Sequence, residues 1–547
     1  MVTTEPHPPD GSDATDGDGA GGAAGAGGAA GDSGAGGADG ADLAGGAAGG
    51  NGAAGGLRYR SSAGRWVIAA TVMGSGMAAI DATVIGIALP TIGRDFHATL
   101  GTLQWVVTGY TLTLASLLLL GGSLGDRYGR RRVFMVGVSW FALASAACAL
   151  ATGSNELIVL RVLQGVGGAL LTPGSLAILE ASFASDDRSE AIGAWSGLGG
   201  VATAAGPLVG GYLISAASWR WIFLINIPIG VLVLVVSARH VPESHDSSVV
   251  GGIDVGGAAL ATASLAATAY ALIEGPSRGW ASGTVVASLA VGVTGAAAFA
   301  VVESRSASPM LPLGLFRNRQ LAVTNAVTFV VYAGLGGVLF LLPVVLQVSS
   351  GYSPLESGVA LLPITGVMLV LSARSGRLAS KIGPRLQMSA GPVMVGAGLV
   401  LMSRAPDGSY VTAVLPAVLV LALGLAVTVA PLTSTALNSV SPSHAGLASA
   451  VNNDVARLGS LIAVAVLPAL GGITGLSYLH PHELAHGFQR AVVIAGSWCV
   501  VGGIAAAVGI RNPPRPAGTT VSSPKDGRTH CALEATPLGD AGSQQAP

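Results

Sequence analysis

Four ionisable residues stand inside long apolar stretches of this sequence. Asp81 and Arg161 lie in the first and fourth stretches, and Asp454 and Arg457 lie three residues apart in the last but one. A charged side chain at the centre of a bilayer costs about 2.5–3.5 kcal/mol on insertion scales, so each of these residues needs a partner or a function. An acid placed there could bind and release protons, and a nearby arginine could balance the negative charge of its ionised form.

Asp81 lies midway along its apolar stretch, and we favour a role in proton exchange if its side chain faces a cavity. The alternative is a structural hydrogen bond to a Ser or Thr of a neighbouring helix. Arg161 is followed one turn later by Gln164. It could pair with Asp81, which would ease the cost of burying both charges, or extend to the membrane surface marked by Asn155 and Glu156.

The stretch VNNDVARLG at 451–459 is the most polar of the apolar segments. Asp454 and Arg457 are three residues apart, so on a helix they share a face and could neutralise each other. Asn452 and Asn453 could line a cavity. A self-satisfied ion pair is an equally good interpretation of this segment.

The sequence carries none of the motifs that would indicate an enzyme. It has no phosphate-binding loop, no G-x-S-x-G stretch, no HExxH and no CxxC. Three histidines, His480, His482 and His486, cluster near the C-terminal end, but their spacing is not diagnostic of a metal site and we interpret them as solvated loop residues. We therefore expect no enzymatic activity, no cofactor and no metal.

The composition indicates which elements must hold these residues. Only 10% of the 547 residues are charged and the mean hydropathy is +0.64, whereas soluble domains carry about 25% charged residues. Apolar stretches of about 18 residues or more can cross a bilayer, and helices satisfy their backbone groups there. We predict an all-α integral membrane protein with fourteen spans, at 66–90, 102–122, 132–152, 156–178, 190–214, 221–238, 253–273, 282–302, 321–347, 355–373, 386–403, 411–435, 446–470 and 489–510.

Basic residues predict the orientation of these spans. With both termini in the cytoplasm, twenty of the 27 Lys and Arg residues fall on the cytoplasmic side and five in the outer loops, as the positive-inside rule requires. Membrane topology thus accounts for the basic residues, and no nucleic-acid partner is implied. The first 56 residues are mostly Gly, Ala and Asp, and we interpret residues 1–64 and 511–547 as disordered cytoplasmic tails.

A charged loop, GSLGDRYGRRRVF at 122–134, separates the second and third spans. The arginines of this loop can be explained by membrane orientation alone, because basic residues hold a loop on the cytoplasmic side. Membrane orientation does not explain the spacing of the glycines and charges. A partial copy, GRLASKIGPR, follows at 376–385, in which Ser380 replaces Asp126. Such a repeat indicates two related halves. We expect a six-helix bundle at 65–240, an inserted helix pair with linkers at 241–320, and a second six-helix bundle at 321–510.

The loop pattern G-x-L-G-D-R-x-G-R-R at 122–131 resembles the signature loop of the major facilitator superfamily. Further stretches are similar to its fourteen-helix drug:proton antiporter family: IDATVIGIALP (80–90), QWVVTGYTL (104–112), RVLQG (161–165), AAGPLVGG (204–211) and WRWIFLINIPIG (219–230). The resemblance covers about residues 65–510. Two departures stand out, Gly86 where many relatives have Asn, and Ser380 in the second loop.

The resemblance implies a secondary transporter of the cell membrane that exports small amphipathic compounds, such as antibiotics, in exchange for protons. It implies proton coupling at Arg161, and the cost of burying an acid makes Asp81 our other candidate for proton coupling. It also implies a cytoplasmic gating loop of Gly122, Asp126, Arg127, Gly129, Arg130 and Arg131, and an antiporter motif of Gly206, Pro207, Gly210 and Gly211. Our candidates for lining the substrate cavity are Gln104, Trp105, Tyr110, Gln164, Asn452, Asn453, Asp454 and Arg457. We expect a monomer. The alternatives are uptake of a small metabolite and a non-transporting membrane sensor.

Overall fold

The computed structural model describes residues 56–246, 254–306, 309–441 and 445–512. Within this part of the chain, fourteen helices are long and apolar enough to cross a membrane, which confirms the predicted number of spans. Most of residues 1–64 and 511–547, the two predicted tails, lie outside the described residues. The first helix begins at Ser62 and Leu57 bonds to the backbone of Ser182, so the folded part starts before the predicted boundary at residue 65.

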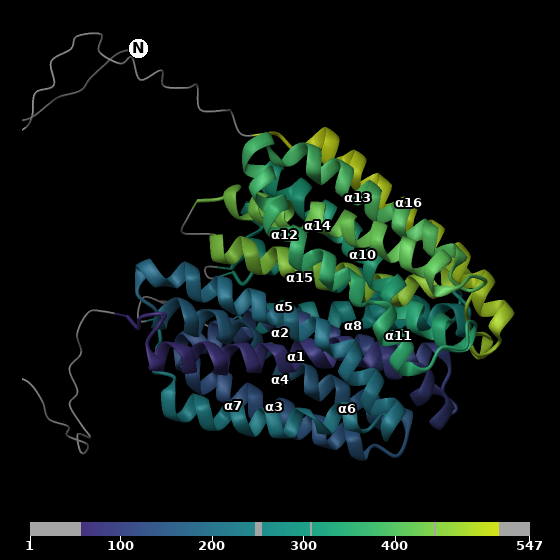
Figure 1. The fold of residues 1–547 in the computed structure, drawn as a ribbon, viewed down its shortest axis with the longest axis horizontal. Coiled ribbons are helices and arrows are strands. Elements are labelled where there is room, and N and C mark those ends of the chain that lie inside the picture. Colours follow the sequence, from purple (N-terminus) through teal and green to yellow (C-terminus); the bar gives the residue numbers. More distant parts are fainter. Residues whose placement is uncertain (1–55, 247–253, 307–308, 442–444, 513–547) are drawn as a thin grey trace, which may run out of the picture. The chain divides into compact units, whose positions relative to one another are not determined.

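Seven helices make the six spans of the first bundle, because the sixth span is divided in two (Figure 1). They are α1 (Ser62–Asp95), α2 (Leu100–Tyr128), α3 (Arg130–Leu150), α4 (Ser154–Ser182), α5 (Ser185–Ala216), and α6 (Trp221–Leu224) with α7 (Asn226–His240). Buried residues of α2, α3 and α4 pack closely against one another, and α1 packs against α5 and α7.

The second bundle has the same number of spans and lies beside the first (Figure 1). It comprises α10 (Arg319–Val348), α11 (Pro354–Ala360) with α12 (Leu362–Ile382), α13 (Pro384–Leu401), α14 (Leu415–Asn438), α15 (Ala445–Gly471) and α16 (Pro481–Gly509). Its core is formed mainly by α10 against α15 and α16 and by α13 against α14 and α16. His482 and His486 lie in the first turns of α16 and not in a loop, which corrects our interpretation of them.

The inserted pair consists of α8 (Val255–Arg278) and α9 (Gly283–Arg305). Helix α8 packs against both α2 and α15, one from each bundle, so it covers the line along which these two helices meet. Helix α9 packs chiefly against α8, and most of its side chains are exposed as a lipid-facing helix requires.

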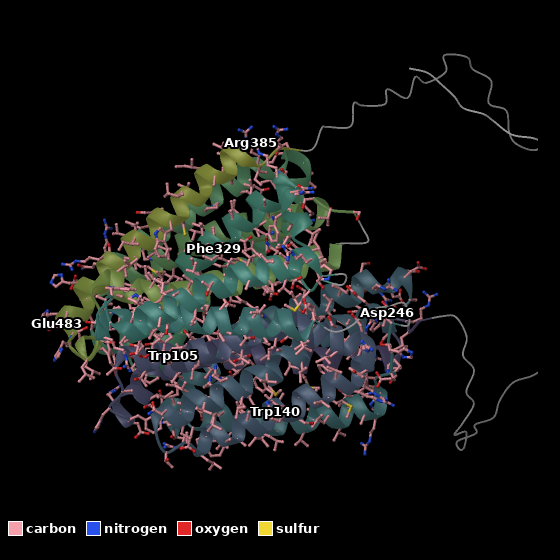
Figure 2. All side chains as sticks on the ribbon, turned by 180° about the vertical axis from the view of Figure 1, so that it is seen from behind. Trp105, Trp140, Asp246, Phe329, Arg385 and Glu483 are labelled. Atoms are coloured by element: carbon pink, nitrogen blue, oxygen red, sulfur yellow. The ribbon has the colours of Figure 1, made fainter. Side chains whose placement is uncertain are left out.

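The two ends of the membrane-spanning body differ in charge and in contacts. We call the end that carries residues 122–131 and 376–385 the basic end, and the opposite end the far end. Asp246 lies at the basic end, and Glu483 at the far end (Figure 2). Among the described residues, the hydrogen bonds that join the two bundles lie in the half of the body toward the far end.

Three side chains make these far-end connections. Gln104 of α2 donates to the backbone oxygen of Val464 at 2.6 Å, and Gln347 of α10 donates to that of Ile87 at 2.9 Å. Tyr478, in the segment before α16, donates its hydroxyl hydrogen to the backbone oxygen of Ala98 at 2.7 Å. The interface between the bundles is therefore closed at the far end.

Candidate functional site

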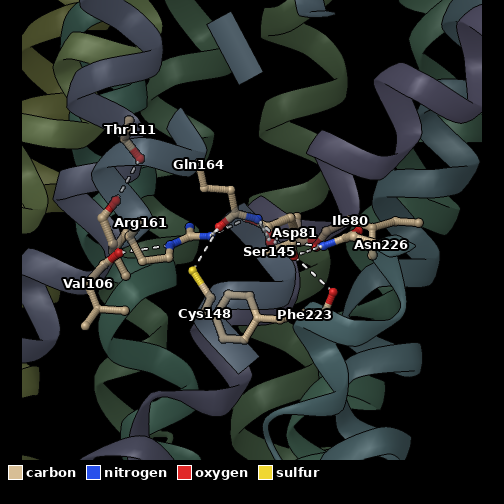
Figure 3. Close-up of polar contacts among 12 residues, drawn as sticks. Ile80, Asp81, Val106, Thr111, Ser145, Cys148, Arg161, Gln164, Phe223 and Asn226 are labelled. Atoms are coloured by element: carbon tan, nitrogen blue, oxygen red, sulfur yellow. Dashed lines mark hydrogen bonds and ion pairs between the residues drawn. The ribbon is translucent and has the colours of Figure 1, made fainter. Parts of the chain in front are cut away.

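A network of buried polar side chains occupies the interior of the first bundle (Figure 3). At its centre the Arg161 Nη1 lies 2.5 Å from the Asp81 Oδ2, and both side chains are almost fully buried. Gln164 donates from Nε2 to the other carboxylate oxygen of Asp81 at 2.9 Å and accepts from the Arg161 Nη1 at 2.6 Å. Arg161 therefore pairs with Asp81 and does not extend to the membrane surface.

Two residues that the sequence did not single out complete this network (Figure 3). Asn226 of α7 donates from Nδ2 to the Ser145 Oγ at 3.0 Å and to the Asp81 carboxylate at 3.4 Å. Ser145 of α3 donates in turn to the backbone oxygen of Phe223 at 3.0 Å. Asn226 belongs to the stretch 219–230, which we had noted only for its resemblance, and Ser145 has no signal in the sequence. The network thus joins α1, α3, α4, α6 and α7.

The position of Asp81 differs from our expectation. Its neighbours Ala82 and Thr83 line the central cavity, but Asp81 points to the other side of α1, into the first bundle, and is 3% exposed. The condition that it faces a cavity is therefore not met in this conformation. Its hydrogen-bond partners are Arg161, Gln164 and Asn226 and not a Ser or Thr.

Close helix packing brings Arg161 to this position. A side chain at Gly165 would collide with the backbone oxygen of Tyr110 on α2, so glycine permits α4 to approach α2 closely. The Arg161 Nε consequently reaches the backbone oxygen of Val106 at 3.2 Å, and its guanidinium carbon lies 4.3 Å from the centre of the Tyr110 ring. Stacking on an aromatic face stabilises a cation.

A central cavity of about 560 Å³ lies between the two bundles. Its walls come from α1, α2 and α5 of the first bundle and from α10, α11–α12 and α15 of the second. Most of the lining surface is apolar, and the polar groups on it are mainly hydroxyls of Thr, Ser and Tyr. This size and composition are typical of a site for a drug-sized organic compound.

Tyr110 connects the cavity with the buried network. It lines the cavity, and its ring also packs against the Arg161 guanidinium. Of the other candidates for lining the cavity, Asn453 and Arg457 do so. Gln164 belongs to the buried network instead.

Three further candidates lie away from the cavity. Gln104 makes the far-end connection between the bundles, and Trp105 packs near Tyr270 of the inserted pair. Asn452 donates to Asn325 and Thr328 of α10 at 2.9 and 2.8 Å, so it holds two helices of the second bundle together. These three assignments to the cavity were wrong, because their faces of α2 and α15 are turned toward other helices.

Asp454 and Arg457 form no salt bridge with each other among the described residues. The charge of Arg457 still acts on Asp454, but the two side chains enter different pockets. Arg457 lines the central cavity, whereas Asp454 lines a smaller pocket of about 160 Å³ among α2, α8, α9 and α15. A spacing of three residues turns the side chains by about 60° around the helix, which is enough to separate them when α15 stands between two pockets.

The described contacts of Asp126 and Arg131 in the charged loop lie within the first bundle and the segment that follows it. Asp126 pairs with Arg130 at 2.9 Å, and the backbone N–H of Arg131 donates to the Glu243 Oε1 at 3.0 Å, just after α7. Gly129 adopts a φ of +107° between α2 and α3, a conformation that favours glycine.

The second loop repeats this arrangement in the second bundle. Gly383 adopts a φ of +88° between α12 and α13, and the backbone N–H of Arg385 donates to the Asn512 Oδ1 at 3.0 Å, just after α16. Ser380 turns back to the backbone oxygen of Arg377. The repeat seen in the sequence is therefore a repeat in structure, with a carboxylate contact replaced by an amide contact.

The predicted antiporter motif lies where α5 meets both bundles. Gly206 and Gly210 face Thr83 and Val84 of α1, while Gly211 faces Leu355 of α11. Pro207 is inside α5, lines the central cavity, and presents its backbone oxygen to Gly358 of α11. Small residues here allow α5 to touch α1 and α11 together.

Nothing in the described part of the chain resembles a metal site: no three His, Cys, Asp or Glu side chains gather there.

Comparison with known proteins gives consistent results. The family model for the Major Facilitator Superfamily matches residues 71–464. The tetracenomycin C resistance and export protein of Streptomyces glaucescens is 36% identical over 73% of this chain and 74% of its own length. The puromycin resistance protein of Streptomyces alboniger is 34% identical over 79% of this chain and 88% of its length. The methylenomycin A resistance protein of Streptomyces coelicolor is 33% identical over 83% of this chain and 94% of its length.

Solved structures share the fold at low sequence identity. The peptide transporter POT in complex with sulfate has a TM-score of 0.61 at 14% identity, covering 82% of this chain and 96% of that one. A bacterial homologue of the human lysosomal transporter Spinster, in an inward-facing and unoccupied conformation, has a TM-score of 0.59 at 15% identity, covering 82% and 97%.

Proposed function

Because the chain belongs to the major facilitator superfamily, we propose that it is a proton-coupled exporter of small amphipathic organic compounds of the antibiotic type. The observation that carries the proposal is the central cavity, which contacts between the bundles close at the far end. The buried acid–arginine pair lies on the opposite side of the helix that forms this wall of the cavity. Relatives over most of the chain are named for antibiotic resistance, and one of them for export as well, which supports efflux over uptake.

We propose that the basic end faces the cytoplasm of the cell that makes the protein, with both termini on that side. Compounds would enter the cavity from the cytoplasm or the inner leaflet, since the far end is closed in this structure. Opening the far end requires these contacts to break and the basic ends of the bundles to meet. The loop at 122–131 then lies where it can engage the second bundle.

The coupling would act through Asp81. Its carboxylate holds Arg161 at 2.5 Å, and Arg161 in turn contacts Tyr110 on the cavity wall. A proton on Asp81 removes the charge that holds the guanidinium, so Arg161 shifts toward its remaining partners, Gln164 and the Val106 backbone oxygen. That shift moves the Tyr110 ring and so changes the shape of the cavity. Proton binding and substrate binding then favour different conformations of one molecule, which is what antiport requires.

The test uses everted membrane vesicles in which respiration acidifies the lumen and a dye reports the pH difference. Tetracenomycin C, puromycin and methylenomycin A, the compounds named for the relatives, form the first panel. An exported compound should partly dissipate the gradient in vesicles that contain the chain and not in vesicles that lack it. Accumulation of compound in whole cells would indicate uptake instead, and no movement with any compound would refute transport of this class.

A further inference from the structure

The ionisable groups of the central cavity are of one sign. Among the described residues that line it, Arg457 is the only one that carries charge at neutral pH, and no Asp or Glu reaches the wall. The acid at Asp81 lies behind α1 and is held by Arg161. The cavity is therefore electropositive.

The guanidinium of Arg457 makes no ion pair or hydrogen bond with any residue that the structure describes. The nearest acid along the helix, Asp454, lines the separate pocket on the other side of α15. A charge in an apolar cavity is costly without a partner, and a bound anion would supply one. Arginine also offers a planar fork that matches a carboxylate with two hydrogen bonds.

The tyrosine on the cavity wall does not supply the missing partner. The Tyr110 Oη is buried inside the first bundle, where it packs against Gly168 of α4. Arg457 is therefore the group in the described cavity lining that can pair with an anion.

We propose that the central cavity selects organic anions, carboxylates or phenolates, whose acidic group is bound by Arg457. The apolar body of the ligand packs against Ile85 of α1 and against Leu339 and Phe340 of α10, which line the same cavity. This inference rests on the proposed function, because it names the substrate class of that transporter.

The experiment compares three ligands of nearly equal shape: 2-naphthoate, the neutral 2-naphthalenemethanol and the cationic 2-naphthylmethylammonium. Binding to the purified full chain in phosphatidylcholine nanodiscs is measured by titration calorimetry, with no ion gradient. The parent protein should bind the naphthoate at least about tenfold more tightly than the other two, a difference of about 1.4 kcal/mol.

Arg457→Gln should remove this preference by weakening naphthoate binding, without lowering thermal stability, which a merely structural role would not give. Arg457→Lys should retain part of the preference, because the charge remains while the planar two-bond contact is lost. The matched control is Arg490→Gln, which removes an equal charge from the exposed far end.

The proposal is overturned if the parent protein binds the ammonium or the alcohol as tightly as the naphthoate, if it binds no naphthoate, or if Arg457→Gln keeps the preference. The outcome is independent of export. A chain that binds naphthoate as expected but dissipates no proton gradient would refute the proposed function and leave the anion site standing.

Discussion

Replacing Asp81 with asparagine should both destabilise the protein and abolish proton-coupled export. The substitution keeps the shape of the side chain and removes its charge. Arg161, which is 0% exposed, then has no anion to balance it. Gln164 and the Val106 backbone oxygen remain as its hydrogen-bond partners.

The magnitude follows from the burial of the pair. Removing one partner of a fully buried ion pair costs about 3–5 kcal/mol, because the other charge is left uncompensated. Replacing both charges at once avoids this cost. We therefore expect Asp81→Asn to lose a few kcal/mol, and the double variant Asp81→Asn/Arg161→Gln to recover most of it, with a coupling energy of about 2–3 kcal/mol between the two sites.

The assay combines thermal unfolding in nanodiscs with the vesicle gradient measurement. The double variant should be nearly as stable as the parent protein and still fail to dissipate the proton gradient when a compound is added, because no titratable acid remains in the network. The comparison separates loss of coupling from loss of folding, which the single variant alone would confuse. Asp95→Asn is the matched control, since Asp95 forms an exposed pair with Arg220 at the far end.

Two results would refute this reasoning. Export by Asp81→Asn at the parent rate, with unchanged dependence on the pH gradient, would show that the acid is structural. Equal stability of the parent protein, the single variants Asp81→Asn and Arg161→Gln, and the double variant would show that the buried pair carries no net interaction.

The remaining predictions concern the ends of the molecule. Asp126→Asn should change the free energy of unfolding by no more than about 1 kcal/mol, because the ion pair of Asp126 with Arg130 is partly exposed. Export should nevertheless fall sharply in vesicles that contain equal amounts of protein, and unchanged export would mean that the acid has no gating role. Gly358→Val should weaken far-end closure, since the valine side chain would collide with the Pro207 backbone oxygen. Distance measurements between spin labels across the far end should then report a larger population of molecules open at that end. Gly366→Val, where the structure has open space, is the control and should leave that population unchanged. Removing residues 1–55 and 513–547 should leave vesicle export largely intact, and its loss would assign a required role to the tails.

The fold was predictable because the requirements of a membrane are strict. Length and apolarity alone give fourteen spans, since each must satisfy its own backbone groups in lipid. The loop repeat was predictable for a similar reason, because Gly129 and Gly383 hold backbone conformations that other residues rarely adopt. Helix ends are harder to predict because they depend on local contacts, and the first helix begins at Ser62, before the predicted start of the bundle at residue 65.

The site was less predictable, because helix rotation and tertiary contacts decide which face of a span meets which neighbour. The cost of burying charge identified Asp81 and Arg161 as residues that need partners, and the structure brings them together. The same argument gave the wrong result for Asp454 and Arg457, since it cannot see that two pockets flank α15. Ser145 and Asn226 escaped notice because single uncharged polar residues are common in membrane helices.

The hydrogen bonds that close the far end have one property in common. Gln104, Gln347 and Tyr478 all donate to main-chain oxygens, those of Val464, Ile87 and Ala98. A backbone carbonyl oxygen is present whatever residue stands at its position. The three accepting positions can therefore be substituted during evolution without loss of the hydrogen-bond acceptors that close the far end. Saturation mutagenesis under antibiotic selection should therefore find intolerance at the three donors and broad tolerance at the three acceptors for residues of similar size.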